Sequence, residues 1–211
     1  MRSNTAQHWD IFCRIVDNFG DIGICWRLSQ QLAAEHDLHI RLFIDNLETA
    51  KKIIPSLNPQ VPTQIINNVE ISIYPNQNYK IKPAKVALET FSCGLPEEYI
   101  NTLTDETTWI NLEYLSAEPW VEDFHLVSSN NTKIKRHFYF PGFTIKTGGL
   151  IRENEIIETN QNIAGNPSRI SNFFNKLKLS HHETSTNALN ISLFGYPQAP
   201  IEQILNCMAD A

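Results

Sequence analysis

The sequence predicts an α/β fold built on a Rossmann-like parallel sheet. Three features support this prediction: an apolar strand near the N-terminus, a glycine-containing loop directly after it, and an amphipathic helix that leads into a second apolar strand. This strand-loop-helix-strand order is typical of a right-handed crossover between parallel strands. With 211 residues, the chain is long enough to bury a sizeable core.

The first crossover unit is predicted from short segments of contrasting pattern. Residues 9–16 (WDIFCRIV) are apolar and β-branched, which indicates a buried strand. Residues 24–35 place apolar side chains near one helical face. The run HIRLFI at 39–44 predicts the next strand, and a short helix over 47–54 is expected to stop at Pro55.

The middle of the chain predicts further strands and helices. Strands are expected at 69–74, 85–88, 108–112 and 125–128, and helical segments at 96–103, 119–124 and 167–179. Residues 138–143 and 147–149 are expected to form an aromatic and glycine-rich loop region.

A change of composition near residue 180 predicts a domain boundary. The polar stretch SHHETSTN at 180–187 indicates a linker. After it, a strand is expected at 189–194 and a helix at 201–208. Because one strand and one helix cannot bury a core alone, the expected organisation is an N-terminal Rossmann-like domain over 1–179, a linker over 180–188 and the first β-α unit of a truncated second domain over 189–211.

Composition excludes several classes of function. Lys and Arg number 17 and Asp and Glu number 23, so the net charge is −6, whereas nucleic-acid binding needs a basic surface. The four cysteines form no C-x-x-C pair, so no zinc site is expected. The first seven residues are polar and no apolar run suits a membrane span, so a reducing cytoplasm is the expected compartment.

The loop DNFGDIG at 17–23 is the candidate site. It lies where a strand passes into a helix, and open α/β sheets bind ligands there. Gly20 and Gly23 allow a tight turn and a close approach, and a helix N-terminus suits a pyrophosphate. Asp17 and Asp21 stand four residues apart, so both carboxylates can face one cleft and hold a cation or take a proton.

Two other interpretations of this loop remain open. Asp21 or Asn18 can serve only as a helix cap, since both residue types are common there. A different Rossmann-like nucleotide binder is disfavoured, because Asn18 stands where the G-x-G-x-x-G fingerprint needs its first glycine.

Long segments throughout the chain show a family resemblance. They are WDIFCRIVDNFGDIGICWRL from Trp9, LETFSCGLPEEY at 88–99, WINLEYLSAEPWVEDFH at 109–125, FYFPGFTIKTGGLIRE at 138–153 and ISLFGY at 191–196. Together these segments resemble the bacterial arginine rhamnosyltransferases that modify translation elongation factor P, the EarP family. The resemblance covers essentially the whole chain.

This resemblance implies a metal-independent glycosyltransferase of the GT-B type, in which two Rossmann-like domains face each other across a cleft. The implied reaction transfers L-rhamnose from dTDP-β-L-rhamnose to one arginine of elongation factor P with inversion, and it needs no cofactor. The family's second domain continues well beyond residue 211 and supplies most of the donor site. The chain by itself is therefore expected to be inactive, and the alternative is a non-catalytic protein that binds elongation factor P.

The resemblance also implies roles for particular residues. The assigned residues are Asp17 and Asp21 as catalytic groups, and Phe19, Gly20, Gly23, Phe194 and Tyr196 as substrate-binding groups. A guanidinium is protonated at ordinary pH, and carboxylates can both grip it and accept its proton. Asp21 is therefore expected to act as the base, and Asp17 to orient it or the guanidinium. Four residues that follow a strand either line the acceptor cleft or form a solvated loop: Glu113, Tyr114, Ser116 and Glu118.

Overall fold

The computed structural model describes residues 7–16, 19–74, 81–129, 134–179, 191, 193, 195 and 198–209. The chain divides into two compact units, residues 1–154 and 155–211. The expected linker at 180–188 lies outside the described residues. The division into domains over 1–179 and 189–211 stays a prediction.

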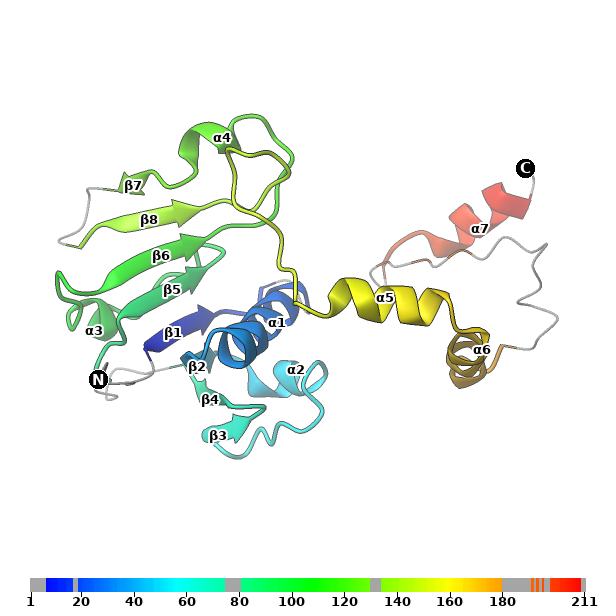
Figure 1. The fold of residues 1–211 in the computed structure, drawn as a ribbon, viewed down its shortest axis with the longest axis horizontal. Coiled ribbons are helices and arrows are strands. Elements are labelled where there is room, and N and C mark those ends of the chain that lie inside the picture. The colour runs from blue at the N-terminus through cyan, green and yellow to red at the C-terminus, as the bar shows by residue number, and fades with distance from the viewer. Residues whose placement is uncertain are drawn as a thin grey trace. The chain divides into compact units, whose positions relative to one another are not determined.

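An eight-stranded sheet forms the first unit, in the order β3-β4-β2-β1-β5-β6-β8-β7 (Figure 1). The strands are β1 (His8–Cys13), β2 (His39–Ile44), β3 (Thr63–Ile66), β4 (Val69–Ile73), β5 (Val86–Thr90), β6 (Thr108–Leu112), β7 (Ser128–Ser129) and β8 (Arg136–Tyr139). Within this order, the run β4-β2-β1-β5-β6-β8 pairs in parallel, and β3 and β7 pair antiparallel at the two edges. If only the parallel strands are numbered along the chain, their order across the sheet is 3-2-1-4-5-6, which is the order of a doubly wound Rossmann sheet. The predicted α/β class with a parallel sheet is confirmed.

Several element boundaries differ from the prediction. Strand β1 ends at Cys13, and helix α1 (Gly20–Glu35) begins at Gly20 instead of Ile24. Strand β8 lies partly where an aromatic loop was expected, because its sequence RHFY is half-buried throughout and shows no apolar run. Strand β3, which alternates exposed and half-buried side chains at the sheet edge, and helix α5 (Ile156–Ala164) were not predicted.

The two faces of the sheet bury separate apolar clusters, because successive side chains of a strand point to opposite faces. On one face, Ile11 and Cys13 pack with residues of α1 and of α2 (Leu47–Lys51). On the other face, Phe12 stacks on Phe43 with ring centroids 4.8 Å apart and packs with residues around α3 (Glu97–Ile100). Helix α4 (Val121–Phe124) follows β6. The core therefore lies on both sides of β1, as a doubly wound sheet requires.

The second unit contains α5, α6 (Pro167–Lys176) and α7 (Ile201–Ala209). Helix α6 starts as its sequence suggests, since the Asn166 side chain accepts a hydrogen bond from the Arg169 N–H at 3.2 Å and Pro167 occupies the first turn. Among the described helices of the chain, none is both long and apolar enough to cross a membrane.

A buried ion pair joins β1 to its neighbours. Asp10 is fully buried, and its carboxylate accepts hydrogen bonds from Arg41 Nε and Nη2 at 2.6 and 2.7 Å. The Tyr99 hydroxyl and the Ala84 N–H also donate to Asp10. Burial acts to lower the pKa of Arg41, but Asp10 outweighs it and the pKa is raised. Burial, together with Asp10, raises the pKa of Tyr99.

Residues 151–154, which we call the strap, run along α1. The guanidinium of Arg27 donates to both carboxylate oxygens of Glu153 and to the Ile151 carbonyl. One turn further along α1, Gln31 donates to the Arg152 carbonyl at 2.7 Å, and Glu35 accepts from the Asn154 N–H at 2.8 Å. Arg27, through its hydrogen bonds, lowers the pKa of Glu153. Polar contacts from one helix face therefore fix the whole strap.

Replacing Arg41 by Met should lower the free energy of unfolding by about 3–5 kcal/mol, because the Asp10 charge stays buried without its ionic partner. Urea denaturation of the chain measures this loss. The double variant Asp10→Asn/Arg41→Met should recover much of it. Lys146→Met, which breaks an exposed pair with Glu122, is the matched control and should leave the midpoint unchanged. If Arg41→Met and Lys146→Met lost the same free energy of unfolding, the Asp10–Arg41 pair would contribute no more to stability than an exposed pair, which would contradict its assignment as a buried ion pair.

The strap should loosen when Glu153 loses its charge. Because the pKa of Glu153 is lowered in the folded chain, its contact contributes fully above the ordinary carboxyl pKa of about 4.3 and is lost as the pH falls through the lowered value. Glu153→Gln should therefore speed amide hydrogen exchange of the strap already at pH 7. Arg152→Gln is the control: it keeps the backbone carbonyl that accepts from Gln31, and it should leave amide hydrogen exchange of the strap unchanged. Unchanged exchange in Glu153→Gln would show that the ion pair does not hold the strap.

Candidate functional site

The candidate site lies at the carboxyl edge of the sheet, near β1 and β5. These two strands are adjacent, and the chain order of the parallel strands reverses between them. Open α/β sheets bind ligands in the crevice at such a reversal. The segments that follow β1, β5 and β6 all start at this edge.

Asp21 occupies the first turn of α1 with its side chain almost fully buried, at 1% exposure. Its Oδ2 accepts a hydrogen bond from the Val16 N–H at 2.8 Å, and its Oδ1 accepts one from the Tyr114 hydroxyl at 2.8 Å. The N-cap of α1 is Phe19, which makes no side-chain capping bond within the described part of the chain. Asp21 is therefore not the N-cap residue of α1, and its two bonds described here come from residues outside the helix.

The other predicted site residues are described only in part. Asp17, Phe194 and Tyr196, like Asn18, lie outside the described residues. Phe19 is 41% exposed, and the Lys52 Nζ lies 5.7 Å from the centre of its ring. Gly20 begins α1, and a Cβ placed on Gly23 would meet no described atom within 4 Å. The structure thus brings Phe19, Gly20 and Gly23 together with Asp21, while their substrate-binding roles stay predictions.

Tyr114 follows β6 and is placed by an aromatic stack. Its ring lies on the ring of Phe91 with centroids 4.1 Å apart and an interplanar angle of 9°. Phe91 and Ser92, directly after β5, have φ angles of 54° and 53°, a left-handed conformation that is uncommon for residues other than glycine. The Phe91 N–H donates to the Leu112 carbonyl at 2.6 Å, which holds the end of β5 against the end of β6.

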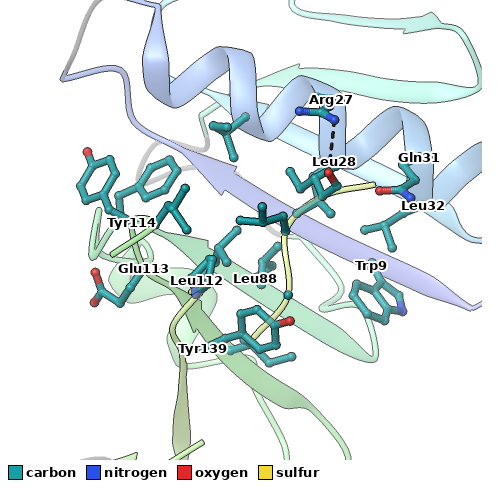
Figure 2. A pocket seen from close by; sticks show the side chains of 18 residues that line it. Trp9, Arg27, Leu28, Gln31, Leu32, Leu88, Leu112, Glu113, Tyr114 and Tyr139 are labelled. Carbon is teal, nitrogen blue, oxygen red and sulfur yellow. Dashed lines mark hydrogen bonds between the residues drawn. The ribbon is translucent and has the colours of Figure 1, made fainter. Parts of the chain in front are cut away.

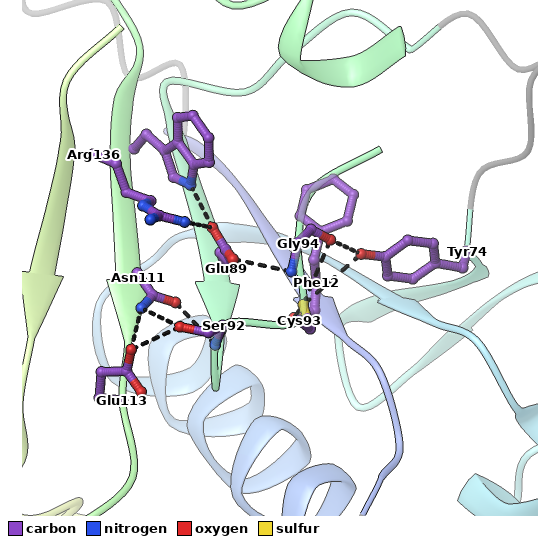
Figure 3. A network of polar contacts seen from close by, with 10 residues as sticks. Phe12, Tyr74, Glu89, Ser92, Cys93, Gly94, Asn111, Glu113 and Arg136 are labelled. Carbon is purple, nitrogen blue, oxygen red and sulfur yellow. Dashed lines mark hydrogen bonds and ion pairs between the residues drawn. The ribbon is translucent and has the colours of Figure 1, made fainter. Parts of the chain in front are cut away.

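A polar cluster of Ser92, Asn111 and Glu113 stabilises this strained turn (Figure 3). Asn111 is fully buried, and its Oδ1 accepts from the Ser92 N–H at 3.1 Å. The Asn111 amide and the Ser92 hydroxyl both donate to Oε1 of Glu113. One oxygen of Glu113 is therefore held in place by two donors, one on β6 and one in the turn after β5.

Glu89 ties the same turn to the sheet from the opposite side. Its buried carboxylate accepts from the Gly94 N–H at 2.9 Å and from Trp109 Nε1 at 3.0 Å, and Arg136 lies 3.5 Å away (Figure 3). Such a buried carboxylate costs free energy unless donors satisfy it. Here the donors come from β6, from β8 and from the turn itself, so Glu89 fixes the turn after β5 relative to three parallel strands.

A largely apolar cavity of about 690 Å³ lies next to this edge (Figure 2). Apolar side chains of α1 and of β5 and β6 line it, together with residues 149–151. Figure 2 shows Glu113 and Tyr114 on one side of it and Trp9 and Leu32 on another. Within the described ranges, no cluster of His, Cys, Asp or Glu side chains is arranged to hold a metal ion.

The sequence indicated only some of these residues. Glu113 and Tyr114 were expected either in an acceptor cleft or in a solvated loop, and the structure connects Tyr114 to Asp21. Phe91, Ser92 and Asn111 were missed. The available signal was their place at the carboxyl ends of predicted parallel strands, where polar and aromatic side chains meet at one edge.

The comparisons with known proteins agree on one family. The family described as "Elongation-Factor P (EF-P) rhamnosyltransferase EarP" matches residues 9–211. A protein-arginine rhamnosyltransferase of Shewanella oneidensis is 41% identical over 204 residues, which cover 92% of this chain and 51% of the relative. Proteins of the same name from Pseudomonas putida and Pseudomonas aeruginosa are 37% and 35% identical over 207 residues, which cover 96% of this chain and 54% of each relative.

The chain therefore spans about half the length of the curated relatives it matches. The family match nevertheless extends from the first strand of the sheet to the last residue. The resemblance found in the sequence is confirmed, and the chain belongs to the EarP family of elongation factor P rhamnosyltransferases.

Proposed function

We propose that this chain is the acceptor-binding half of a protein-arginine rhamnosyltransferase that transfers L-rhamnose from dTDP-β-L-rhamnose to an arginine of elongation factor P. The single observation that supports this most is the position of Asp21. A buried carboxylate lies at the strand-order reversal of a Rossmann-like sheet and is held by donors from two different loops. The names of the relatives supply the reaction class.

The chemistry of the acceptor explains the need for such a carboxylate. An arginine side chain carries its proton at any ordinary pH and is a poor nucleophile. Asp21 grips the guanidinium through a charge-assisted hydrogen bond and accepts its proton as the new bond forms. The guanidinium nitrogen attacks the anomeric carbon of rhamnose, the bond from that carbon to dTDP breaks, and dTDP leaves with the electron pair. Attack opposite the leaving group inverts the anomeric centre.

The remaining assignments complete the proposal. Asp17 orients Asp21 or the guanidinium, and Phe19, Gly20 and Gly23 shape the acceptor site. The open space beside Gly23 supports this role, since no described atom would touch a side chain there. Phe194 and Tyr196 contact the nucleotide in a second domain of a GT-B enzyme, which needs no metal or other cofactor. A translation factor as acceptor places the reaction in the cytoplasm.

A second candidate function is binding without turnover. The chain spans only about half of its relatives, and in the proposed enzyme most of the donor site lies in the other half. Under this alternative the 211 residues bind elongation factor P and leave it unmodified. Completing the chain with the C-terminal half of the Shewanella relative separates the two candidates. The completed protein is incubated with elongation factor P and dTDP-β-L-rhamnose, and intact-mass analysis shows the mass of one added rhamnose under the first candidate and unmodified elongation factor P under the second.

Asp21→Asn should abolish most of the transfer without unfolding the protein. In a chain completed with the C-terminal half of the Shewanella relative, we expect turnover to fall by about 10²–10⁴-fold, the usual worth of a general base. The melting temperature should change little, because the Asn oxygen still accepts from Val16 and the Tyr114 hydroxyl can accept from the Asn amide. Single-turnover rates and thermal melting measure both effects.

The matched control is Asp105→Asn, an exposed carboxylate in the turn before β6, at the opposite edge of the sheet. It should leave both turnover and melting temperature unchanged. A stable Asp21→Asn protein with near-normal turnover would remove Asp21 from the mechanism.

The 211-residue chain alone should bind dTDP weakly, with a Kd above about 1 mM, because it contains only Phe194 and Tyr196 of the expected nucleotide site. Calorimetry at millimolar dTDP tests this expectation. The parallel titration with elongation factor P should show binding, since the acceptor residues are present. Micromolar dTDP affinity would place the donor site within these residues. It would contradict the proposal that the acceptor site lies in this half of the enzyme and most of the donor site in the other.

A further inference from the structure

The carboxylate of Asp21 is oriented from two directions. Val16, in the segment after β1, donates its N–H to Oδ2, and Tyr114, in the segment after β6, donates its hydroxyl to Oδ1, both at 2.8 Å. Two donors on different oxygens fix both the position and the plane of a carboxylate. Substitutions of Val16 other than proline leave the backbone donor in place, whereas substitution of Tyr114 can remove the side-chain donor.

Tyr114 is itself held rigidly although half of its surface is exposed. Its ring stacks on Phe91 at 4.1 Å. On one side of it the Glu113 N–H donates to the Tyr139 carbonyl at 2.9 Å, and on the other the Ser116 N–H donates to the Pro141 carbonyl at 3.2 Å. The ring of Tyr114 is thus held by a residue that follows β5, and the backbone on either side of it by residues at the end of β8 and just after it.

The support continues behind the aromatic stack. Phe91 keeps its left-handed conformation because its own N–H bonds the Leu112 carbonyl and its neighbour Ser92 bonds buried Asn111. A residue held in a sparsely populated conformation persists only where its surroundings determine it strongly. The contacts run from Asn111 and Ser92 to Phe91, then to Tyr114, and end on Asp21.

We infer that Tyr114 is a positioning residue that sets the orientation of the Asp21 carboxylate toward the acceptor guanidinium. The inference rests on the proposed function, because it takes Asp21 as the group that grips the acceptor. Proton transfer and bidentate recognition both depend on alignment, so the tyrosine acts on the acceptor through Asp21. Phe91 contributes by holding the tyrosine ring.

A double-mutant cycle with the 211-residue chain tests this inference. Binding of elongation factor P is measured by calorimetry for the unsubstituted chain, Tyr114→Phe, Asp21→Ala and the double variant. Tyr114→Phe keeps the stack on Phe91 and removes only the hydroxyl, and Asp21→Ala removes the carboxylate that this hydroxyl bonds. We expect Tyr114→Phe to weaken binding about fivefold, the worth of one net hydrogen bond, and to add less than about twofold in the Asp21→Ala background, because coupled residues are not additive.

Two further variants keep the test decisive. Phe91→Leu removes the stack and leaves the hydroxyl, and it should weaken binding only while Asp21 is present. Tyr139→Phe is the matched control, since the Tyr139 hydroxyl makes no hydrogen bond within the described ranges, and its affinity should equal that of the unsubstituted chain. Thermal melting of every variant verifies folding.

The outcomes separate this inference from the proposed function. If the unsubstituted chain does not bind elongation factor P, the proposed function fails and the inference falls with it. If the unsubstituted chain binds and Tyr114→Phe binds equally well, the inference alone is overturned. The same holds if Tyr114→Phe costs the same factor with and without Asp21, because the tyrosine would then act independently of the carboxylate.

Discussion

The pairing of β1 on both sides is the constraint on which the first unit depends. Its register with β2 runs from His8–His39 to Cys13–Ile44, and its register with β5 runs from Trp9–Val86 to Phe12–Glu89. Because β1 separates the two halves of the sheet, it fixes where the strand order reverses. Asp10 locks this strand in register through Arg41 on β2 and through Tyr99 and Ala84 near its other neighbours. The start of α1, and with it Asp21, takes its place from that register.

Support of the site follows a common pattern, in which each strand end is held by its neighbour. The end of β5 bonds the end of β6 through Phe91 and Leu112, and the residue after β6 bonds the end of β8 through Glu113 and Tyr139. Buried Glu89 and Asn111 add side-chain bonds across the same strands. These buried polar groups cost free energy unless each is satisfied. Their satisfaction favours one arrangement of the turns and therefore a preorganised edge.

Much of the fold could be predicted from the sequence because its central elements are locally distinctive. HIRLFI and TWINL are apolar runs of strand length, and both became strands with the predicted bounds. Strand β8 was missed because RHFY lies near an edge, and its partner β6 stabilises it more than its own pattern does. The start of α1 was placed too late because Gly20 and Gly23 disfavour helix locally, whereas burial of Asp21 and Ile22 extends the helix through them.

The site was predictable only in its first element. Asp21 stands in a recognisable strand-to-helix segment, so sequence reasoning reached it. The hydroxyl that orients it comes from a residue 93 positions away, and no local sequence pattern predicts such a contact. Ser92 and Asn111 belong to no recognisable motif either, and the bond between them depends on two strands that become neighbours only in the sheet. Side-chain partners across a sheet follow from register, which periodicity alone does not determine.

The strap also has a consequence for how the chain acquires its structure. Arg27 and Glu153 are 126 residues apart, and Gln31 and Arg152 are 121 apart. Contacts of such long range form late, because the entropy of closing a long loop must first be overcome by shorter-range pairing. During synthesis, which proceeds from the N-terminus, α1 emerges long before its partner exists. The helix face with Arg27 and Gln31 therefore stays without the strap until nearly the whole first unit has left the ribosome, and the strap is the last part of that unit to close.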